Sequence, residues 1–171
     1  MTSTMGPLLG KYAEDFSAGD KMITPSRTVT EADIAAFASL TGDFNPLHTD
    51  EEFAKTTIFG SRIAHGMLTL SFLIGLVSRL GVLDGTVVAF MGINELRFKE
   101  PVRAGDTIHG EMTVKRTRVL GGRGSGLVVV ELAAINQKGT TVLTGELTLM
   151  FKSRAGAETP AMSPTSSLAP S

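Results

Sequence analysis

The feature that most constrains the fold of this chain is an apolar segment, residues 67–80. Its nonpolar side chains cover every side of a helix, and a helix that is apolar all round is buried. Ser71, Gly75 and Ser78 fall at helical spacing and form a stripe of small residues, which would let a sheet or a partner helix approach closely. The segment is shorter than the ~20 residues of a membrane-spanning helix. We therefore expect a buried helix in a globular protein.

After this segment the chain changes to β-branched and apolar runs, which are typical of strands. The runs are residues 86–98, 107–119, 127–136 and 141–151. Turn-forming residues at 121–126 and 137–139 separate the last three and predict hairpins. The glycine-rich run 121–126 precedes no helix pattern, which argues against a phosphate-binding turn. One buried helix followed by antiparallel strands predicts an α+β fold, with the sheet wrapped around the helix.

Shorter elements are predicted before the buried helix. Residues 21–29 favour a first strand, and Thr30 is a suitable N-cap for a helix that would stop at Gly42. The apolar face of this helix would consist of Ile34, Phe37, Ala38 and Leu40. We expect residues 43–49 to form a loop, because Pro46 disfavours helical conformation in the residue before it.

Length and composition suit a single domain. The chain has 171 residues, of which 42% are hydrophobic and 19% charged, so it can build a real core. We expect residues 20–152 to form the folded domain and residues 1–19 to be a surface extension. Residues 153–171 are rich in Pro, Ser, Ala and Thr and predict a disordered tail.

Charge and cysteine content exclude several classes of function. The net charge is −1 and no basic run is present, so we expect neither nucleic acid nor an anionic membrane as a partner. The absence of cysteine rules out disulfides, thiolate metal sites and cysteine nucleophiles. The first residues lack a basic region followed by an apolar one. We expect a soluble, cytoplasmic protein.

The residues with the clearest chemical potential are Asp43 and His48, which lie five positions apart across an Asn45-Pro46 turn. A carboxylate and an imidazole that share one water can take a proton from it and deliver one to carbon, as hydration of an activated double bond requires. Asn45 could hold the loop in shape. A lone Asp or His would favour a structural role, but the pattern Gly-Asp-x-Asn-Pro-Leu-His is far more specific than either residue.

Metal binding fits this motif less well. Asp43 and Asn45 could begin a calcium loop, but an EF-hand needs a ligand at its fifth position and glycine at its sixth, where this chain has Leu47 and His48. The sequence contains no His-Glu-x-x-His motif, and its three histidines are scattered. We therefore expect no metal in the site.

The motif and its surroundings resemble a known family. Residues 37–54, with Gly-Asp-Phe-Asn-Pro-Leu-His at 42–48 and Ala54 after five more residues, resemble the hydratase-2 motif of the (R)-specific enoyl-CoA hydratases, or MaoC-like dehydratases. The later Ala-His-Gly-Met-Leu at 64–68 resembles the family's His-Gly-Met helix start. The resemblance extends over roughly residues 20–152 and implies a hot-dog fold, an antiparallel sheet wrapped around one long helix. The elements predicted from the residues agree with it.

The resemblance also implies a reaction and its residues. Asp43 and His48 would form a catalytic dyad that acts as a coupled unit on the water added to C3 of a trans-2-enoyl-CoA, giving the (R)-3-hydroxyacyl product. Gly66 would offer an N–H at a helix N-terminus to the thioester carbonyl, with no side chain to hinder its approach. His65 could orient the loop, cap the helix or touch substrate, and a structural role is favoured. No metal or organic cofactor is implied, and a homodimer is expected, since the family pairs two sheets into one.

Two other functions remain open. One is a related hot-dog enzyme: a dehydratase of a branched or dicarboxylic acyl-CoA such as mesaconyl-CoA, or a thioesterase, which the lack of a carboxylate in residues 67–80 disfavours. The other is a non-catalytic acyl-thioester binding module, which would not require both Asp43 and His48.

His109 is expected on a sheet face, and residues 100–106 resemble the family's turn between two strands, for which a structural role is expected. Candidate contacts for the CoA phosphates are Arg62, Arg97, Lys99, Arg103, Lys115, Arg116 and Arg118.

Overall fold

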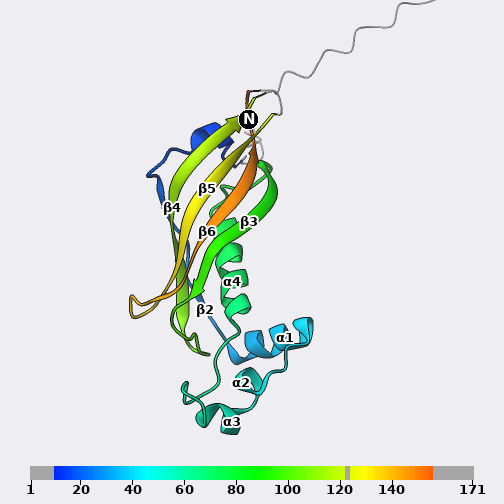
Figure 1. Cartoon of the computed structure of the whole chain (residues 1–171), viewed down its shortest axis with the longest axis vertical. Helices are drawn as coiled ribbons and strands as arrows, with labels where there is room; N and C mark the ends of the chain where they lie inside the picture. The colour runs from blue at the N-terminus through cyan, green and yellow to red at the C-terminus, as the bar shows by residue number, and fades with distance from the viewer. Residues whose placement is uncertain (1–9, 122–123, 156–171) are drawn as a thin grey trace, which may run out of the picture.

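One antiparallel sheet wraps around one helix, α4 (Gly66–Ser78), in the computed structural model, which describes residues 10–121 and 124–155 (Figure 1). The strands are β1 (Lys21–Ile23), β2 (Arg27–Thr28), β3 (Val87–Phe98), β4 (Thr107–Leu120), β5 (Ser125–Asn136) and β6 (Thr141–Lys152). Their order is β1-β4-β5-β6-β3, and β2 also pairs with β4. This is the predicted hot-dog fold, and each long strand begins and ends within two residues of its predicted bounds.

The sheet curves around α4 because its strands are interrupted by irregularities in register. β3 shifts register against β6 between Asn94 and Arg97, and Glu95 there has a φ of 52°. Such bulges bend a strand and increase its twist. On β4, Gly110 lets the helix approach, since a Cβ at this position would lie 2.5 Å from Cδ1 of the fully buried Leu73. The core therefore forms directly between α4 and the concave face of the sheet.

α4 is only partly buried by its own chain. It begins at Gly66, one residue before the predicted start, and its core-facing residues are Leu68, Thr69, Leu70, Leu73, Leu76 and Val77. Met67, Ser71, Gly75 and Ser78 are exposed, although the sequence predicted burial on every side. The predicted stripe of small residues is therefore an open face of the helix, available to a further element.

The amino-terminal part departs most from prediction. The strand expected over residues 21–29 is two short strands, β1 and β2, separated around Pro25, which has no N–H for a ladder. Residues 1–19 were expected at the surface, but Phe16 is buried with its ring centroid 4.8 Å from that of Phe151. It follows the short 3₁₀ helix η1 (Ala13–Asp15).

The start of the predicted tail also belongs to the folded unit. Arg154 binds the Asp15 carboxylate with both terminal nitrogens, at 2.6 and 2.8 Å, and Ser153 is buried. Residues 156–171, the rest of that tail, lie outside the described residues, as do residues 1–9.

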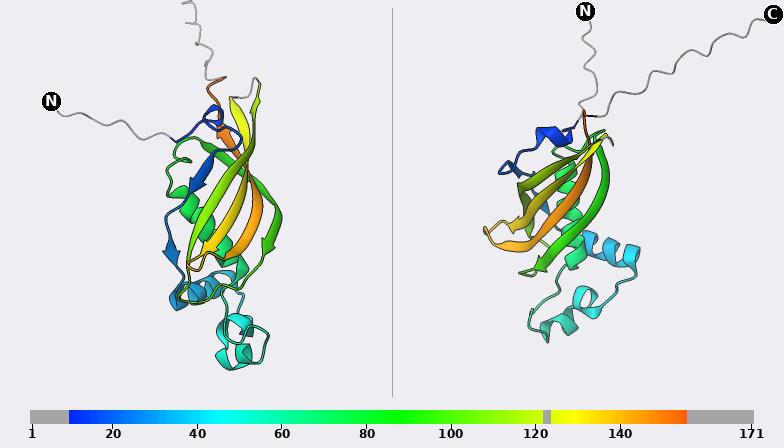
Figure 2. Two further views of the ribbon diagram at one scale, coloured as in Figure 1. Left: turned by 90° about the vertical axis from the view of Figure 1, so that its left-hand side faces the viewer. Right: turned by 45° about the horizontal axis from the view of Figure 1, so that its top comes forward.

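A helical segment, residues 31–63, projects from one end of the sheet and carries α1 (Glu31–Thr41), α2 (Pro46–Thr49) and α3 (Glu51–Lys55) (Figure 2). Thr30 is the N-cap of α1, and its side chain and that of Asp33 form a capping box. Its predicted apolar face is only partly buried, since Leu40 is 83% exposed. Within the described residues, no helix has the length and apolar character needed to cross a membrane.

Candidate active site

The motif at residues 42–48 is a helix end followed at once by a new helix start. Gly42 ends α1 with a φ of 77°, a left-handed conformation that glycine adopts without strain. Asn45 is the N-cap of α2, its Oδ1 accepting the N–H of Leu47 at 3.0 Å, and Pro46 takes the first helical position. His48 thus lies in a helical turn, not in the loop that was predicted over residues 43–49. Asn45 therefore holds the start of α2 through its side-chain oxygen.

The imidazole of His48 is held by a carbonyl group. Its Nδ1 lies 2.8 Å from the main-chain oxygen of Ile63, which can only accept a hydrogen bond. Nδ1 therefore carries the proton, and in the neutral ring Nε2 carries the lone pair. This is the arrangement that a general base requires.

Asp43 lies beside this ring at the molecular surface. Its side chain is 53% exposed, and its Oδ1 accepts the N–H of Asn45 at 3.3 Å. A carboxylate oxygen of Asp43 and a ring nitrogen from each of His48 and His65 all lie within 4.8 Å of one another. A water with hydrogen bonds of about 2.8 Å spans two such groups. The predicted dyad is therefore brought together at a separation that one water can bridge.

His65 is buried and contacts both Asp43 and His48. It is only 3% exposed, and its Nε2 donates to the main-chain oxygen of Asp43 at 3.0 Å. Its ring stacks on that of His48 with centroids 3.8 Å apart and planes inclined by 31°. It occupies the N-cap position of α4, yet its side chain makes no capping hydrogen bond. Of the roles considered from sequence, orientation of the Asp43–His48 segment agrees with these contacts, and helix capping does not.

A cavity of about 340 Å³ opens next to this group of residues. His48, Gly66 and Thr69 contribute to its lining, and so do the rings of Phe59 and Phe98. Gly66 is the first residue of α4, where the N–H has no partner within the helix. A Cβ on Gly66 would lie 2.8 Å from Cε1 of Phe98, so the missing side chain also makes room for this ring. An imidazole and a helix N-terminus thus face one largely apolar space.

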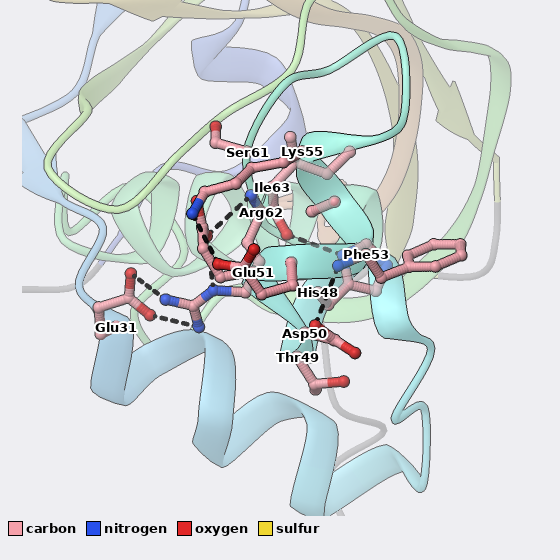
Figure 3. Close-up of polar contacts among 12 residues, drawn as sticks. Glu31, His48, Thr49, Asp50, Glu51, Phe53, Lys55, Ser61, Arg62 and Ile63 are labelled. Atoms are coloured by element: carbon pink, nitrogen blue, oxygen red, sulfur yellow. Dashed lines mark hydrogen bonds and ion pairs between the residues drawn. The ribbon is translucent and has the colours of Figure 1, made fainter.

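Two arginines hold the loop that carries the Ile63 carbonyl. Arg62 forms ion pairs of 3.0 Å with both Glu31 on α1 and Glu51 on α3 (Figure 3). The Arg62–Glu51 hydrogen bond lowers the pKa of the Glu51 carboxyl and raises the pKa of the guanidinium. Arg62 is therefore a tether within the helical segment, a role that sequence reasoning missed.

Arg103 is the second tether. Its guanidinium donates to the carbonyl of Phe59 at 2.7 Å and to Ser61 Oγ at 2.9 Å, and its own N–H donates to the Asp106 carboxylate. The structural role expected for residues 100–106 thus extends to one wall of the cavity. Of the other basic candidates, Lys99 lines the cavity, whereas Lys115 and Arg116 pair with Glu146.

Asp43, His48 and His65 are close enough together to be considered as metal ligands. Zinc ligands at about 2.1 Å in a tetrahedron lie roughly 3.4 Å from one another, whereas His65 Nε2 lies 4.0 Å from Oδ2 of Asp43. His48 Nδ1 and His65 Nε2 both donate to carbonyls, so these two nitrogens have no lone pair to offer. The arrangement favours a hydrogen-bonded water, and the expectation of no metal stays a prediction.

Comparison with known proteins places this site in a family. The family description "MaoC like domain" matches residues 15–155 of the chain. The chain belongs to the MaoC-like dehydratase family. As a member it is a hydro-lyase, an enzyme that adds or removes water. The resemblance inferred from the motif is thereby confirmed.

Individual MaoC-like relatives differ in length and in name. Protein MaoC of Klebsiella aerogenes is 46% identical over 109 residues, covering 64% of this chain and 32% of that protein. The (R)-specific enoyl-CoA hydratase of Rhodospirillum rubrum is 35% identical over 152 residues, covering 86% of this chain and 96% of that protein. The solved "(R)-hydratase from A. caviae involved in PHA biosynthesis" is 34% identical with a TM-score of 0.67, covering 80% of this chain and 97% of that one. The chain therefore spans about a third of the first relative and nearly all of the other two.

Proposed function

We propose that this MaoC-like chain is an (R)-specific enoyl-CoA hydratase, which adds water reversibly to a trans-2-enoyl-CoA. The observation that carries the proposal is the meeting of Asp43 and His48, within 4.8 Å of each other, beside an apolar cavity that His48 and Gly66 both line. The names of the R. rubrum and A. caviae relatives support it.

The geometry suggests how the residues divide the chemistry. The dyad holds one water, takes a proton from it as its oxygen attacks C3, and returns a proton to C2 from the same face. Because Asp43 and His48 share this water, they act as a coupled pair, and neither is assigned alone as the base. Nε2 of His48 is the free nitrogen of its ring, since Nδ1 is bound to Ile63.

Charge moves to the thioester oxygen as the water adds. The N–H of Gly66 lies at the positive end of α4 and can donate to this oxygen, provided that the carbonyl comes close. The proposal includes no organic cofactor and no metal, because the dyad supplies both proton transfers and the Gly66 N–H supports the charge on the carbonyl.

We also propose that the chain acts as a homodimer paired through β3. This strand forms the edge of the sheet opposite β1, and its exposed apolar residues are Val87, Val88, Phe90, Met91 and Phe98. An apolar edge strand is a template for pairing with another strand. The open face of α4, with Ser71, Gly75 and Ser78, could then pack against a second copy.

The test is hydration of crotonyl-CoA, followed through the loss of enoyl-thioester absorbance, with chiral analysis of the product. We expect D43N and H48A to lower turnover by a factor on the order of 10² or more while the fold persists. D84N and H109A are matched controls, because both residues lie outside the site.

Near-normal turnover in either site variant would remove the dyad assignment. A panel of longer, branched and dicarboxylic enoyl-CoAs separates the related dehydratases from one another. No activity with any thioester would favour the acyl-binding module over the enzyme.

A further inference from the structure

A single buried side chain, His65, contacts both members of the proposed dyad. It precedes α4 and so belongs to the core of the fold, whereas Asp43 and His48 lie on the projecting helical segment. Its ring edge donates to the Asp43 carbonyl at 3.0 Å, and its ring face stacks on His48 at 3.8 Å. Phe37 packs on the same ring at 5.1 Å. His65 therefore connects the segment that carries the dyad to the core.

These contacts determine where the ring protons lie. The Asp43 carbonyl can only accept, so Nε2 of His65 carries a hydrogen, and in the neutral ring Nδ1 carries the lone pair. The same reasoning places the hydrogen of His48 on Nδ1, because that atom donates to Ile63. The two stacked rings are thus held in opposite tautomers, which leaves Nε2 of His48 free for the water.

The remaining nitrogen of His65 shows that packing alone does not account for this residue. Nδ1 is buried and has no hydrogen-bond partner among the described residues. A buried polar atom without a partner lowers stability, and an apolar side chain here would avoid that loss. Since His65 does not cap α4 either, what it adds is the Nε2 donor and a flat ring against His48.

We propose that His65 is a positioning residue, which fixes the separation of Asp43 and His48 through its hydrogen bond to the first and its stacking on the second. The proposal rests on the proposed hydratase function, because it assumes that the two groups share one water. Among the described residues, the other hydrogen bonds of Asp43 are two long ones of 3.3 Å, from its N–H to Thr41 and from the N–H of Asn45 to its carboxylate. Misplacement by about 1 Å can cost ~100-fold in rate.

Two substitutions separate the donor from the ring. H65F keeps a flat ring against His48 but loses the donor to Asp43, whereas H65Q keeps an amide donor in place of Nε2. We expect kcat to fall by roughly 10- to 100-fold in H65F and by less than about 5-fold in H65Q. KM should change by less than about 2-fold in both, because His65 does not line the cavity. H109F, at a histidine on β4, is the control for the substitution itself.

A second measurement links the effect to Asp43. In the D43N background H65F should reduce the remaining rate by less than about 2-fold, because the carboxylate that it positions is already gone. The proposal is overturned if H65F keeps kcat, if H65Q loses as much as H65F, or if the losses in D43N and H65F multiply.

Nitrogen NMR of the three histidine rings tests the arrangement without any assay of activity, and it covers the case in which H65F does not fold. We expect His65 in the Nε2–H tautomer and His48 in the Nδ1–H tautomer, with the spectrum of H109F assigning the third ring. The Nδ1–H tautomer at His65 would contradict the proposal. Absence of hydration by the wild-type protein would refute the hydratase function, whereas the NMR result would still decide how His65 is bound.

Discussion

Replacing Gly66 by alanine tests whether its backbone is the carbonyl-binding group. The added Cβ would lie 2.8, 2.9 and 3.0 Å from Cε1, Cδ1 and Cζ of Phe98. Carbon atoms prefer separations of about 3.5–4.0 Å, so the ring would have to retreat by roughly 0.5–1.2 Å. In the single chain Phe98 is 52% exposed, which leaves its ring room for this movement. We therefore expect a small cost in stability, offset by up to ~1 kcal/mol from the better helix propensity of alanine.

The effect on rate should be much larger. A donor to a developing oxyanion is worth about 10²–10³ in kcat, and a methyl group beside the Gly66 N–H would keep the carbonyl from reaching it. We expect G66A to lower kcat for crotonyl-CoA hydration by about 10²-fold, at the lower end of this range because the N–H itself remains. The melting temperature should stay within a few degrees of wild type, as measured by circular dichroism.

The contact with Phe98 offers a competing explanation, which F98A and the double variant G66A/F98A resolve. If glycine is needed only to accommodate the ring, the double variant will regain the rate of F98A. If the methyl obstructs the carbonyl, the double variant will stay about 10²-fold below F98A. Restoration to the F98A rate, or a G66A variant within about 3-fold of wild type, would refute the carbonyl-binding role.

Three further predictions concern the fold and its assembly. L73A removes a fully buried side chain against Gly110, so it should cost about 2–5 kcal/mol and lower the melting temperature by roughly 5–15 °C; a loss under 2 °C would contradict its place in the core. The hydrogen bond from Lys115 lowers the pKa of Glu146, so this pair stabilises the fold above the unfolded carboxyl pKa of about 4.5, and the contribution is lost as pH falls through the lowered value. The free energies of unfolding in urea of wild type and E146Q should therefore differ at neutral pH and converge in acid. A difference of the same size at every pH would show that ionisation of Glu146 does not stabilise the fold. V88K, on the exposed edge strand β3, should lower the molar mass measured by light scattering toward that of a monomer. An unchanged molar mass would place the dimer contact elsewhere.

The long elements could be predicted because their sequence periods are strong and uninterrupted. α4 and the four long strands are each a dozen or so residues of consistent pattern, so no local signal opposes them. The prediction of one strand over residues 21–29 was wrong, because Pro25 has no N–H to donate to a neighbouring strand. The sequence already contained this signal. The burial of Phe16 could not be predicted from the sequence, because it depends on contact with Phe151 at the other end of the chain.

Exposure was misjudged wherever a surface faces away from the core of its own chain. Leu40 is apolar and lies on a helix, yet it is mostly exposed, and so is Met67 at the start of α4. Periodicity shows which residues share a face, but it does not show whether that face meets the same chain or another one. Exposed apolar residues on β3 and α4 agree with the homodimer that we propose, in which both faces would be covered.

The site was predicted to the extent that it is local. Asp43, Asn45 and His48 lie in one turn, so their proximity follows from the motif itself. His65 was recognised as a candidate, but its contact with both residues of the dyad depends on how α4 meets the helical segment. The tethering role of Arg103 depends on contacts with residues more than 40 positions away, which no spacing rule reveals.

In this fold the residues that set the geometry of the proposed site are largely different from those that stabilise the core. Gly66 and His65 are fixed by the buried helix, whereas Asp43 and His48 lie on a segment that projects beyond the sheet. Polar contacts of His65 and Arg103 join the two sets, and these contacts contribute little of the buried area that stabilises the core. Loss of one such contact should therefore change the rate while the core stays intact, and loss of a core side chain should do the opposite. A fold of this kind can alter its loop and cavity walls with small effects on the sheet and helix that support them.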